Sequence, residues 1–210
     1  MPTEIVEDRA QRPSADRTRD RILAAALDLF SERSFEGAST RVIAERAGVQ
    51  QPLLAYHFGS KEELWRLAVG QLFENLARSF SARVAGLRGV DDKTVAKLVV
   101  ADFVRFSASN PQLHRIIMQE CKSEGDRLAW LVEHHIRPLY NGAASLLEPL
   151  IATGKVRDVP VAHLYYLLTG AAATIFVLAP ECRMLTGVDP FDASEVERHV
   201  DAVISMLFVS

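Results

Sequence analysis

Apolar residues recur along this chain at the spacing of α-helices, and no segment shows the alternation of a half-buried β-strand. The first helical face follows the spacing i, i+4, i+7 and i+8 with Ile22, Ala26, Leu29 and Phe30. The last face repeats this spacing with Val196, Val200, Val203, Ile204, Leu207 and Phe208. The periodicity predicts an all-α protein whose first helix begins near Arg17 and ends around residues 35–37.

Two short helices are predicted after the first one. Ser39 and Thr40 can supply the N-cap of a helix over residues 41–46, because a hydroxyl oxygen accepts hydrogen bonds from first-turn amides. Gly48 ends this helix, since glycine adopts a left-handed or open backbone without steric cost. A third helix is expected over residues 50–57.

Polar caps mark the starts of later helices. Ser60 with Glu63, and Asp192 with Glu195, have the spacing of capping boxes. The first box opens a fourth helix that runs to about residue 84. The helices expected after it cover residues 92–108, 111–119, 126–151, 160–180 and 192–208.

Two prolines interrupt the longest of these later segments. Pro138 and Pro149 both lie within residues 126–151. Because proline lacks an amide hydrogen and its ring clashes with the carbonyl one turn back, we expect this helix to be kinked or broken.

The segment Val159–Ala179 is apolar over a length that would span a bilayer. Pro160, Thr169 and Gly170 interrupt it, and no basic cluster flanks it. We therefore favour a helix of a soluble protein, buried on most sides and ended by Pro180, over a membrane span.

Composition narrows the class of protein. The 210 residues are 49% apolar and 24% charged, with a net charge of −3, which allows one or two globular domains. The overall charge does not favour a nucleic-acid partner, but residues 12–61 hold eight basic and six acidic side chains. Cys121 and Cys182 lie far apart, as expected for two buried thiols in a reducing cytoplasm. The polar N-terminus predicts a disordered arm over residues 1–14 and no secretory signal.

Enzymatic motifs are absent from the sequence. There is no G-x-G-x-x-G, P-loop, G-x-S-x-G or H-E-x-x-H pattern. His134 and His135 are neighbours on a helix and point about 100° apart, so they do not readily chelate one ion. We expect no metal, no cofactor and no enzymatic activity. An enzyme and an architectural DNA-coating protein remain alternatives, although coating DNA does not need the large apolar C-terminal part.

The segment Ser39–Phe58 reads STRVIAERAGVQQPLLAYHF. It places two short helices on either side of a tight glycine turn, behind a longer helix. This is the helix-turn-helix arrangement, in which the second helix enters the major groove of DNA. Short helix pairs occur in many folds, so the pattern alone leaves a purely structural role open.

Residues 15–70 resemble the DNA-binding module of TetR/AcrR-type bacterial transcriptional regulators. The matching positions are Thr40, Ala44, Ala47, Gly48, Val49, Tyr56, Phe58, Lys61 and Leu64, with Val42 and Ile43 in apolar positions. Gln50 departs from the pattern, because the family often has serine there, and this weakens the cap of the second helix. The resemblance implies an N-terminal three-helix DNA-binding domain and a helical C-terminal domain, with about nine helices in all.

The resemblance also implies roles for particular residues. Gln50, Gln51 and Leu53 begin the recognition helix, where glutamine can pair with adenine and leucine can pack on a thymine methyl group. The implied phosphate contacts, which are donors near helix ends, are Thr40, Tyr56 and Lys61.

Other basic positions have two interpretations each. His57 either faces the DNA backbone or packs against its own helix. Arg41 either reaches DNA or pairs with Glu45 one turn later. Arg12, Arg17 and Arg19 either reach DNA or belong to a solvated arm.

The implied organisation is an arm at 1–14, a DNA-binding domain at 15–62 and a dimerisation and effector domain at 63–210. We expect a homodimer that binds a palindromic double-stranded operator and is released by a small molecule. The predicted dimer interface comprises Leu168, Ala172, Ile175, Val200, Ile204 and Leu207. The predicted effector pocket draws on polar side chains within apolar helices, each of which can also be an ordinary core residue: His114, Gln119, Cys121, His134, Tyr140, Tyr165, Tyr166 and Thr169.

Overall fold

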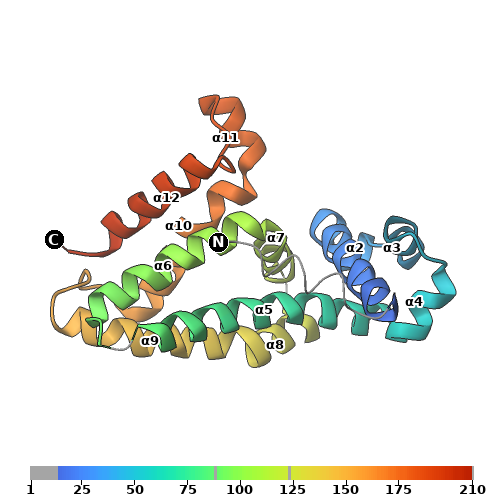
Figure 1. Ribbon diagram of the computed structural model, residues 1–210, viewed down its shortest axis with the longest axis horizontal. Helices are drawn as coiled ribbons and strands as arrows, with labels where there is room; N and C mark the ends of the chain where they lie inside the picture. The colour runs from blue at the N-terminus through green and yellow to red at the C-terminus, as the bar shows by residue number, and fades with distance from the viewer. Residues whose placement is uncertain (1–13, 88, 123, 210) are drawn as a thin grey trace. The chain divides into compact units, whose positions relative to one another are not determined.

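The computed structural model describes residues 14–87, 89–122 and 124–209. Within these ranges the chain is built from helices, and the one β-type pairing is an isolated antiparallel bridge between Val156 and Phe208 (Figure 1). The predicted all-α class is confirmed. The predicted arm lies outside the described residues, apart from Ser14, which opens the first helix.

The chain divides into two compact units, residues 1–71 and 72–210. The division falls inside α5 (Lys61–Gly86), so one continuous helix belongs to both units. The functional boundary predicted at residues 62/63 lies in the same helix and stays a prediction.

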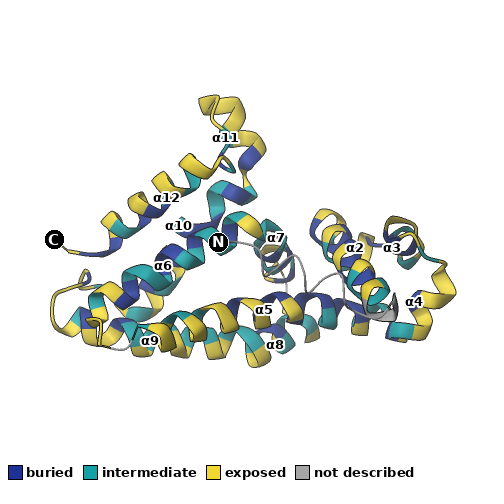
Figure 2. Cartoon of the chain, in the orientation of Figure 1, coloured by how far each residue is buried: buried dark blue, intermediate teal, exposed yellow. Residues whose placement is uncertain are grey.

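The N-terminal unit is formed by α2 (Ser14–Gly37), α3 (Thr40–Ala47), α4 (Gln51–Phe58) and the first turns of α5. Each helix turns its apolar residues toward a shared core, as the buried positions in Figure 2 show. The largest of these buried side chains are Ile22, Leu29, Phe30, Ile43, Leu64 and Trp65. Removal of this apolar surface from water is the main term that holds these helices in one arrangement.

Helix α2 is interrupted at Ser34, where φ is 61° and ψ is 174°. Residues with a side chain rarely adopt this conformation, which costs about 1–3 kcal/mol. The break positions Phe35 to stack on Phe30, with ring centroids 5.9 Å apart, and to meet Trp65 edge-on at 6.4 Å. These aromatic contacts offset the strain.

Two predicted turn signals are confirmed. Gly48 has a left-handed φ of 65°, and its amide donates to the carbonyl of Glu45 at 3.1 Å. The hydroxyl oxygen of Ser60 accepts from the amide of Glu63 at 3.0 Å, which fixes the start of α5. The short turns between α3, α4 and α5 are therefore set by local chemistry.

Two predicted side-chain caps are wrong, although their positions are correct. Ser39 and Asp192 occupy N-cap positions, but neither side chain accepts a cap hydrogen bond. The carboxylate of Glu195 is instead paired with Arg198 at 2.8 Å. Both helices begin with an ordinary backbone bond, from Ile43 and Val196 to the two cap carbonyls.

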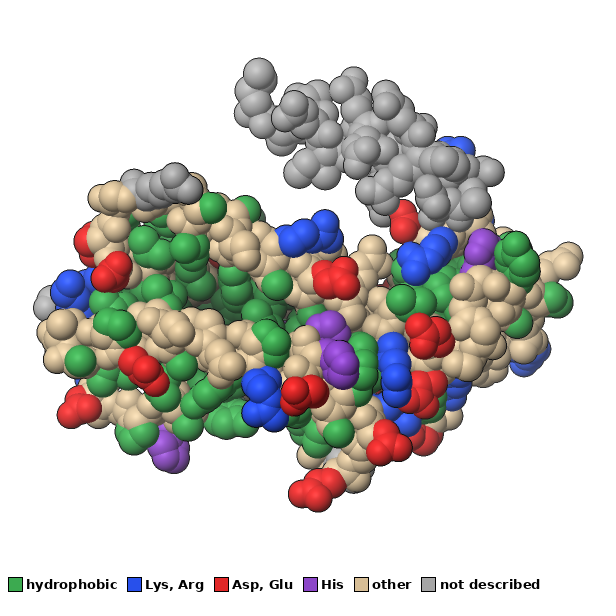
Figure 3. Space-filling view, turned by 90° about the horizontal axis from the view of Figure 1, so that it is seen from below, with side chains coloured by type: hydrophobic (Ala, Val, Ile, Leu, Met, Phe, Trp, Pro, Cys, Tyr) green, Lys and Arg blue, Asp and Glu red, His purple; other side chains and the backbone are tan. Residues whose placement is uncertain are grey.

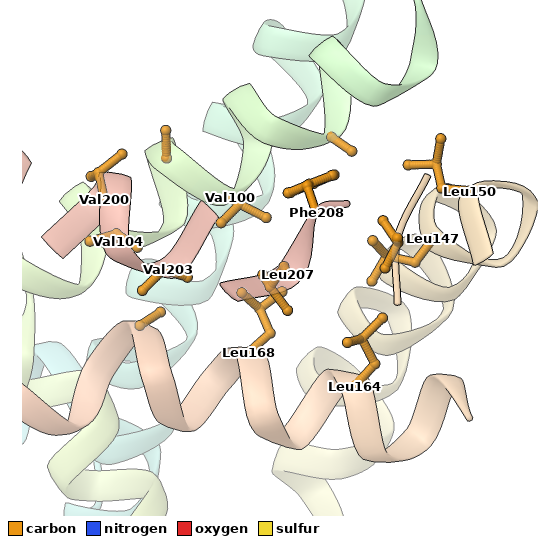
Figure 4. Close-up of a cluster of buried hydrophobic side chains, with 14 of the residues drawn as sticks. Val100, Val104, Leu147, Leu150, Leu164, Leu168, Val200, Val203, Leu207 and Phe208 are labelled. Carbon is orange, nitrogen blue, oxygen red and sulfur yellow. The ribbon is translucent and has the colours of Figure 1, made fainter. Parts of the chain in front are cut away.

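The C-terminal unit contains the remaining helices. They are α6 (Asp92–Ser109), α7 (Pro111–Glu120), α8 (Asp126–Leu131), the π-helical turn η2 (Val132–Ile136), α9 (Arg137–Ala152), α10 (Val161–Val177), α11 (Ala179–Thr186) and α12 (Ala193–Leu207). Side chains from α6, α9, α10 and α12 meet in one buried cluster (Figure 4). The labelled members include Val100, Val104, Leu147, Leu164, Leu168, Val203 and Leu207.

The predicted long helix over residues 126–151 stays helical, but its hydrogen-bond pattern changes before its first proline. Helix α8 ends at Leu131, and the π-helical turn that follows contains both His134 and His135. Pro138 lies in the first turn of α9, where its missing amide costs little. Pro149 stays inside α9, so only one of the two prolines lies next to this change.

The apolar segment after residue 160 forms two helices instead of one. The prediction that Pro180 ends this segment is wrong, because this proline sits in the first turn of α11. Helices α10 and α11 are bent by 72°. Across the described residues no single helix is long and apolar enough to cross a membrane, and only this bent pair has the length and composition together.

Candidate nucleic-acid interface and ligand cavity

Helix α4 exposes one side and buries the other. Leu54 and Phe58 anchor it in the N-terminal core, while the outer side is open to solvent (Figure 2). Two large apolar side chains are unusually accessible there, with Tyr56 81% and Leu53 38% exposed. Gln50 and Gln51 are also exposed. These four predicted contact residues are thus available to a partner outside the subunit.

The starts of α3 and α4 are joined by a side-chain contact. The Gln51 amide nitrogen donates to the Thr40 hydroxyl at 3.2 Å. This bond leaves the Gln51 carbonyl oxygen and the Thr40 hydroxyl proton as groups for a further partner. His57 is half-buried and meets the ring of Tyr56 edge-on at 5.4 Å.

Arg41 pairs with Glu45 on the surface of α3. The two groups lie 3.4 Å apart, and their side chains are 71% and 61% exposed. Such exposed i,i+4 pairs contribute only about 0.3–0.5 kcal/mol. A phosphate could therefore replace Glu45 at little cost, and both interpretations of Arg41 stay open.

Lys61 is held at the first residue of α5. Its ammonium nitrogen lies 3.4 Å from the Glu36 carbonyl oxygen and 4.6 Å from the centre of the Phe35 ring. The carbonyl and the ring face both attract a cation, so the lysine is positioned before any anion binds. The N-terminus of α5 adds a favourable dipole for an anion at this point.

Two further contacts brace the helix pair from behind. Arg46 of α3 makes two bonds to the Glu32 carboxylate of α2, at 2.8 and 2.7 Å. The Arg19 guanidinium lies 5.6 Å from the centre of the Phe58 ring. Arg19 is thus held against α4, and neither contact was predicted from the sequence.

A cavity of about 700 Å³ lies within the C-terminal unit. Its walls are mainly apolar and come from α5, α6, α7, α8, η2, α9 and α10. Five of the eight residues predicted for an effector pocket line it: His114, Cys121, Tyr165, Tyr166 and Thr169. This size is typical of sites for small organic ligands.

The other three predicted pocket residues do not line this cavity. His134 turns its Nδ1 to the Trp130 carbonyl, 2.9 Å away and one turn back. Tyr140 packs edge-on against Tyr165, at 5.2 Å between centroids, so it supports a lining residue. Gln119 is not among the lining residues, although Met118 and Cys121 close to it in sequence are.

Burial controls the ionisation of two lining residues. It lowers the pKa of His114 to about 4, so the imidazole is neutral at physiological pH. It also raises the pKa of Tyr165 to about 12, and the nearby Tyr166 acts in the same direction. The inner wall therefore presents neutral hydrogen-bonding groups.

The mouth of the cavity is marked by exposed residues. Cys121, Lys122 and Glu124 line it and are open to solvent. The prediction that both cysteines are buried is wrong, since Cys121 is exposed and Cys182 is half-buried. Partial burial of its sulfur and the adjacent Glu120 carboxylate raise the pKa of the Cys121 thiol, so it stays protonated.

The residues predicted for a dimer interface lie within the core of their own subunit. Leu168, Ala172, Val200 and Leu207 are buried in the main cluster, and Ile175 and Ile204 pack against it. A helix that is apolar on all sides does not reveal which side faces outward. Large apolar residues that are exposed on the same helices and on α11 are Tyr166, Leu167, Leu178, Met184, Leu185 and Met206. Figure 3 shows hydrophobic side chains gathered over the C-terminal unit on the face drawn there.

The adjacent histidines have separate surroundings. His135 stacks on Phe73 at 4.8 Å, while His134 stacks on Trp130 at 5.4 Å. Within the described part of the chain, no group of three or more His, Cys, Asp or Glu side chains could hold a metal ion.

The helix-turn-helix segment matches a known protein family. The profile of the family described as "Bacterial regulatory proteins, tetR family" matches residues 22–67. The HTH-type transcriptional repressor NicS of Pseudomonas putida is 30% identical over 175 residues, covering 80% of this chain and 79% of that protein. The HTH-type transcriptional regulator RutR of Escherichia coli is 28% identical over 169 residues, covering 79% and 77%.

The likeness extends to solved structures. A putative fatty acid metabolism regulator of Clostridium perfringens matches with a TM-score of 0.70 at 18% sequence identity. The match covers 90% of this chain and 100% of that chain. At this level of identity it shows a shared fold.

Proposed function

Because the chain belongs to the TetR family of bacterial transcriptional regulators, we propose that it is a homodimeric repressor that leaves a palindromic operator when a small molecule fills its cavity. The observation that carries this proposal is the exposed side of α4, which presents Gln50, Gln51, Leu53 and Tyr56 on a firmly anchored helix. Its site of action is the cytoplasm, where bacterial DNA lies.

The exposed side chains of α4 suit direct reading of base edges. Glutamine can bond to adenine with both its oxygen and its nitrogen, and leucine can contact a thymine methyl group. We assign these roles to Gln50, Gln51 and Leu53. Phosphate contacts are assigned to the donors around them, which are Thr40, Arg41, Tyr56, His57 and Lys61.

Dimerisation follows from the way short helices read DNA. One recognition helix covers one half-site, and two-fold symmetric operators require two such helices about 34–36 Å apart. The exposed apolar residues of α10 and α11, such as Leu167 and Leu185, supply surface that a second copy can bury. We therefore propose an interface on α10–α12 that is formed by exposed side chains of these helices. The residues predicted from the sequence are not part of it.

The effector acts through helix α5 in this proposal. This helix carries Lys61 at its start and contributes Phe73 and Leu76 to the cavity wall. A ligand shifts DNA binding only if it binds one conformation better than the other. A bound molecule that repositions α5 would change the spacing of the two recognition helices.

The test is operator binding by the purified protein. Selection from random duplexes should yield an inverted repeat, and Gln51→Ala should reduce preference for it. A promoter reporter then shows whether binding lowers transcription. Recovery of no symmetric sequence would contradict the operator proposal, and increased transcription would identify an activator.

A further inference from the structure

We propose that the cavity selects an uncharged hydrophobic molecule bearing a hydroxyl group, such as an alkylphenol, and rejects the matching carboxylate. This inference rests on the proposed function, in which the same cavity receives the effector. It goes further by naming the chemistry of the ligand, and three hydrogen-bonding groups of the cavity carry it.

The first group is the imidazole of His114, whose tautomer is fixed by Ser107. The Ser107 hydroxyl has one proton and donates it to the Phe103 carbonyl, 2.8 Å away, because a carbonyl can only accept. The Ser107 oxygen lies 3.0 Å from His114 Nε2 and must therefore accept from it. His114 then carries its proton on Nε2, which leaves Nδ1 as an acceptor. Nδ1 makes no hydrogen bond within the described residues.

The second and third groups are the hydroxyls of Thr169 and Tyr165. Thr169 donates its proton to the Tyr166 carbonyl at 3.2 Å, so its oxygen can only accept from a ligand. The Tyr165 hydroxyl makes no hydrogen bond among the described residues and keeps its proton, because burial raises its pKa to about 12. The cavity thus offers two acceptors and one phenolic donor. A ligand hydroxyl, which donates one proton and accepts another, satisfies the phenolic donor and one of the two acceptors.

Charge excludes the carboxylate from the interior. The charged side chains among the lining residues are Lys122 and Glu124, which have opposite signs and lie at the exposed mouth. A carboxylate placed among the inner groups would face the lone pairs of His114 and Thr169 without a cation. Burial of an unpaired charge is costly, and the neutral imidazole offers no compensation.

The apolar walls explain why the ligand is hydrophobic. A recess of about 80 Å³ adjoins the main cavity, and the two share lining residues on α5, α6, α9 and α10. The shared residues are Leu76, Phe103, Leu139, Tyr165 and Thr169. Hydrocarbon can fill this recess while a polar end remains beside His114.

The experiment compares three probes of matched size at neutral pH: para-heptylphenol, para-heptylanisole and para-heptylbenzoate. Binding to the full-length protein is measured by calorimetry without DNA. The phenol should bind roughly tenfold more tightly than the anisole, which lacks a donor. The benzoate should bind most weakly of the three. Equal or tighter binding of the benzoate, or binding of none of the three, would overturn the inference.

Variants locate the selectivity. His114→Leu should remove the preference for phenol over anisole and keep binding of both, whereas His163→Leu, an exposed histidine of α10, should change neither. If His114→Leu does not fold, His114→Phe gives the same test, because it also removes the imidazole acceptor and keeps an aromatic ring. A preference that survives both variants would overturn the inference. Benzoate binding that depends on Lys122 would also do so, since it would place the head group at the mouth.

Operator binding separates this inference from the proposed function. Tight, His114-dependent binding of the phenol supports the ligand chemistry, even if operator affinity does not change. In that case only the effector role of the cavity fails. Operator release by the benzoate, with the phenol inactive, would instead keep the function and reject the ligand chemistry.

Discussion

His114 Nε2 lies 3.0 Å from the hydroxyl oxygen of Ser107, which is itself completely buried. The pair connects α7 to α6 beside the cavity and also holds the imidazole edge-on to Phe103, at 5.8 Å between centroids. A charged imidazole would still donate to Ser107, but it would be deprived of most of its hydration. The hydrogen bond therefore fixes orientation, while burial keeps the ring neutral.

This neutral histidine predicts acid sensitivity. Burial lowers the pKa of His114 from 6.5 to about 4, so its contribution to stability is complete above pH 6.5 and is lost as pH falls toward 4. Between pH 7.5 and pH 5 the free energy of unfolding should drop by about 2 kcal/mol from this residue alone. Urea unfolding at both pH values, compared with His114→Leu, isolates the effect. An identical drop in the variant would contradict it.

Ser34 predicts a stabilising substitution. Glycine adopts a φ of 61° with a ψ of 174° readily, so Ser34→Gly should raise the free energy of unfolding by about 1 kcal/mol. Ser79→Gly, at an exposed position inside α5, is the matched control and should lower it by about 0.5 kcal/mol. Thermal unfolding followed by circular dichroism measures both. Destabilisation by Ser34→Gly would show that Ser34 is not strained.

Lys61 predicts a change in the salt dependence of operator binding. Removing one phosphate-binding ammonium group per subunit should lower the slope of log K against log salt by about two units per dimer in Lys61→Ala. Affinity should fall for specific and non-specific DNA alike, because a phosphate carries no sequence information. Lys155→Ala, on the C-terminal unit, is the lysine control. A changed sequence preference with an unchanged slope would contradict the assignment.

Gln51 predicts a change in sequence preference instead. Gln51→Ala should weaken binding by about 1–3 kcal/mol for each base that the glutamine recognises, and it should relax selection at one position of each half-site. The salt slope should stay unchanged, which separates this variant from Lys61→Ala. Gln71→Ala, an exposed glutamine of α5, serves as the control. Binding measured on a panel of single-base operator variants decides the point.

The helix-turn-helix region could be predicted closely from sequence because its signals are local. Glycine at position 48, the cap at Ser60 and the apolar spacing each act within a few residues, and the family pattern adds to them. The strained backbone at Ser34 could not be found, because the aromatic contacts that compensate for it join Phe35 to a distant residue, Trp65. The DNA contacts of individual residues remain predictions.

The cavity could be predicted only in part, for a physical reason. Polar residues such as His114 and Thr169 stand out within apolar helices, but the apolar walls look like any core in the sequence. Ser107 was missed because its role depends on a partner in the next helix. Helix α11 was missed because Pro180 can end one helix or open another, and the sequence does not distinguish these.

The last prediction concerns dimerisation. Ile175 packs against its own core, so a charge there would unfold the subunit and reveal nothing about assembly. Leu167 is on the same helix, α10, but 55% exposed, so Leu167→Asp should leave the fold intact. In a two-fold interface this residue occurs twice, so the variant buries two charges and should yield monomers with weakened operator binding. Val84→Asp, a 50% exposed position on α5, is the matched control and should remain dimeric. Light scattering gives the mass of each protein, and a dimeric Leu167→Asp together with dimeric variants at Leu185 and Met206 would rule out this surface as the interface.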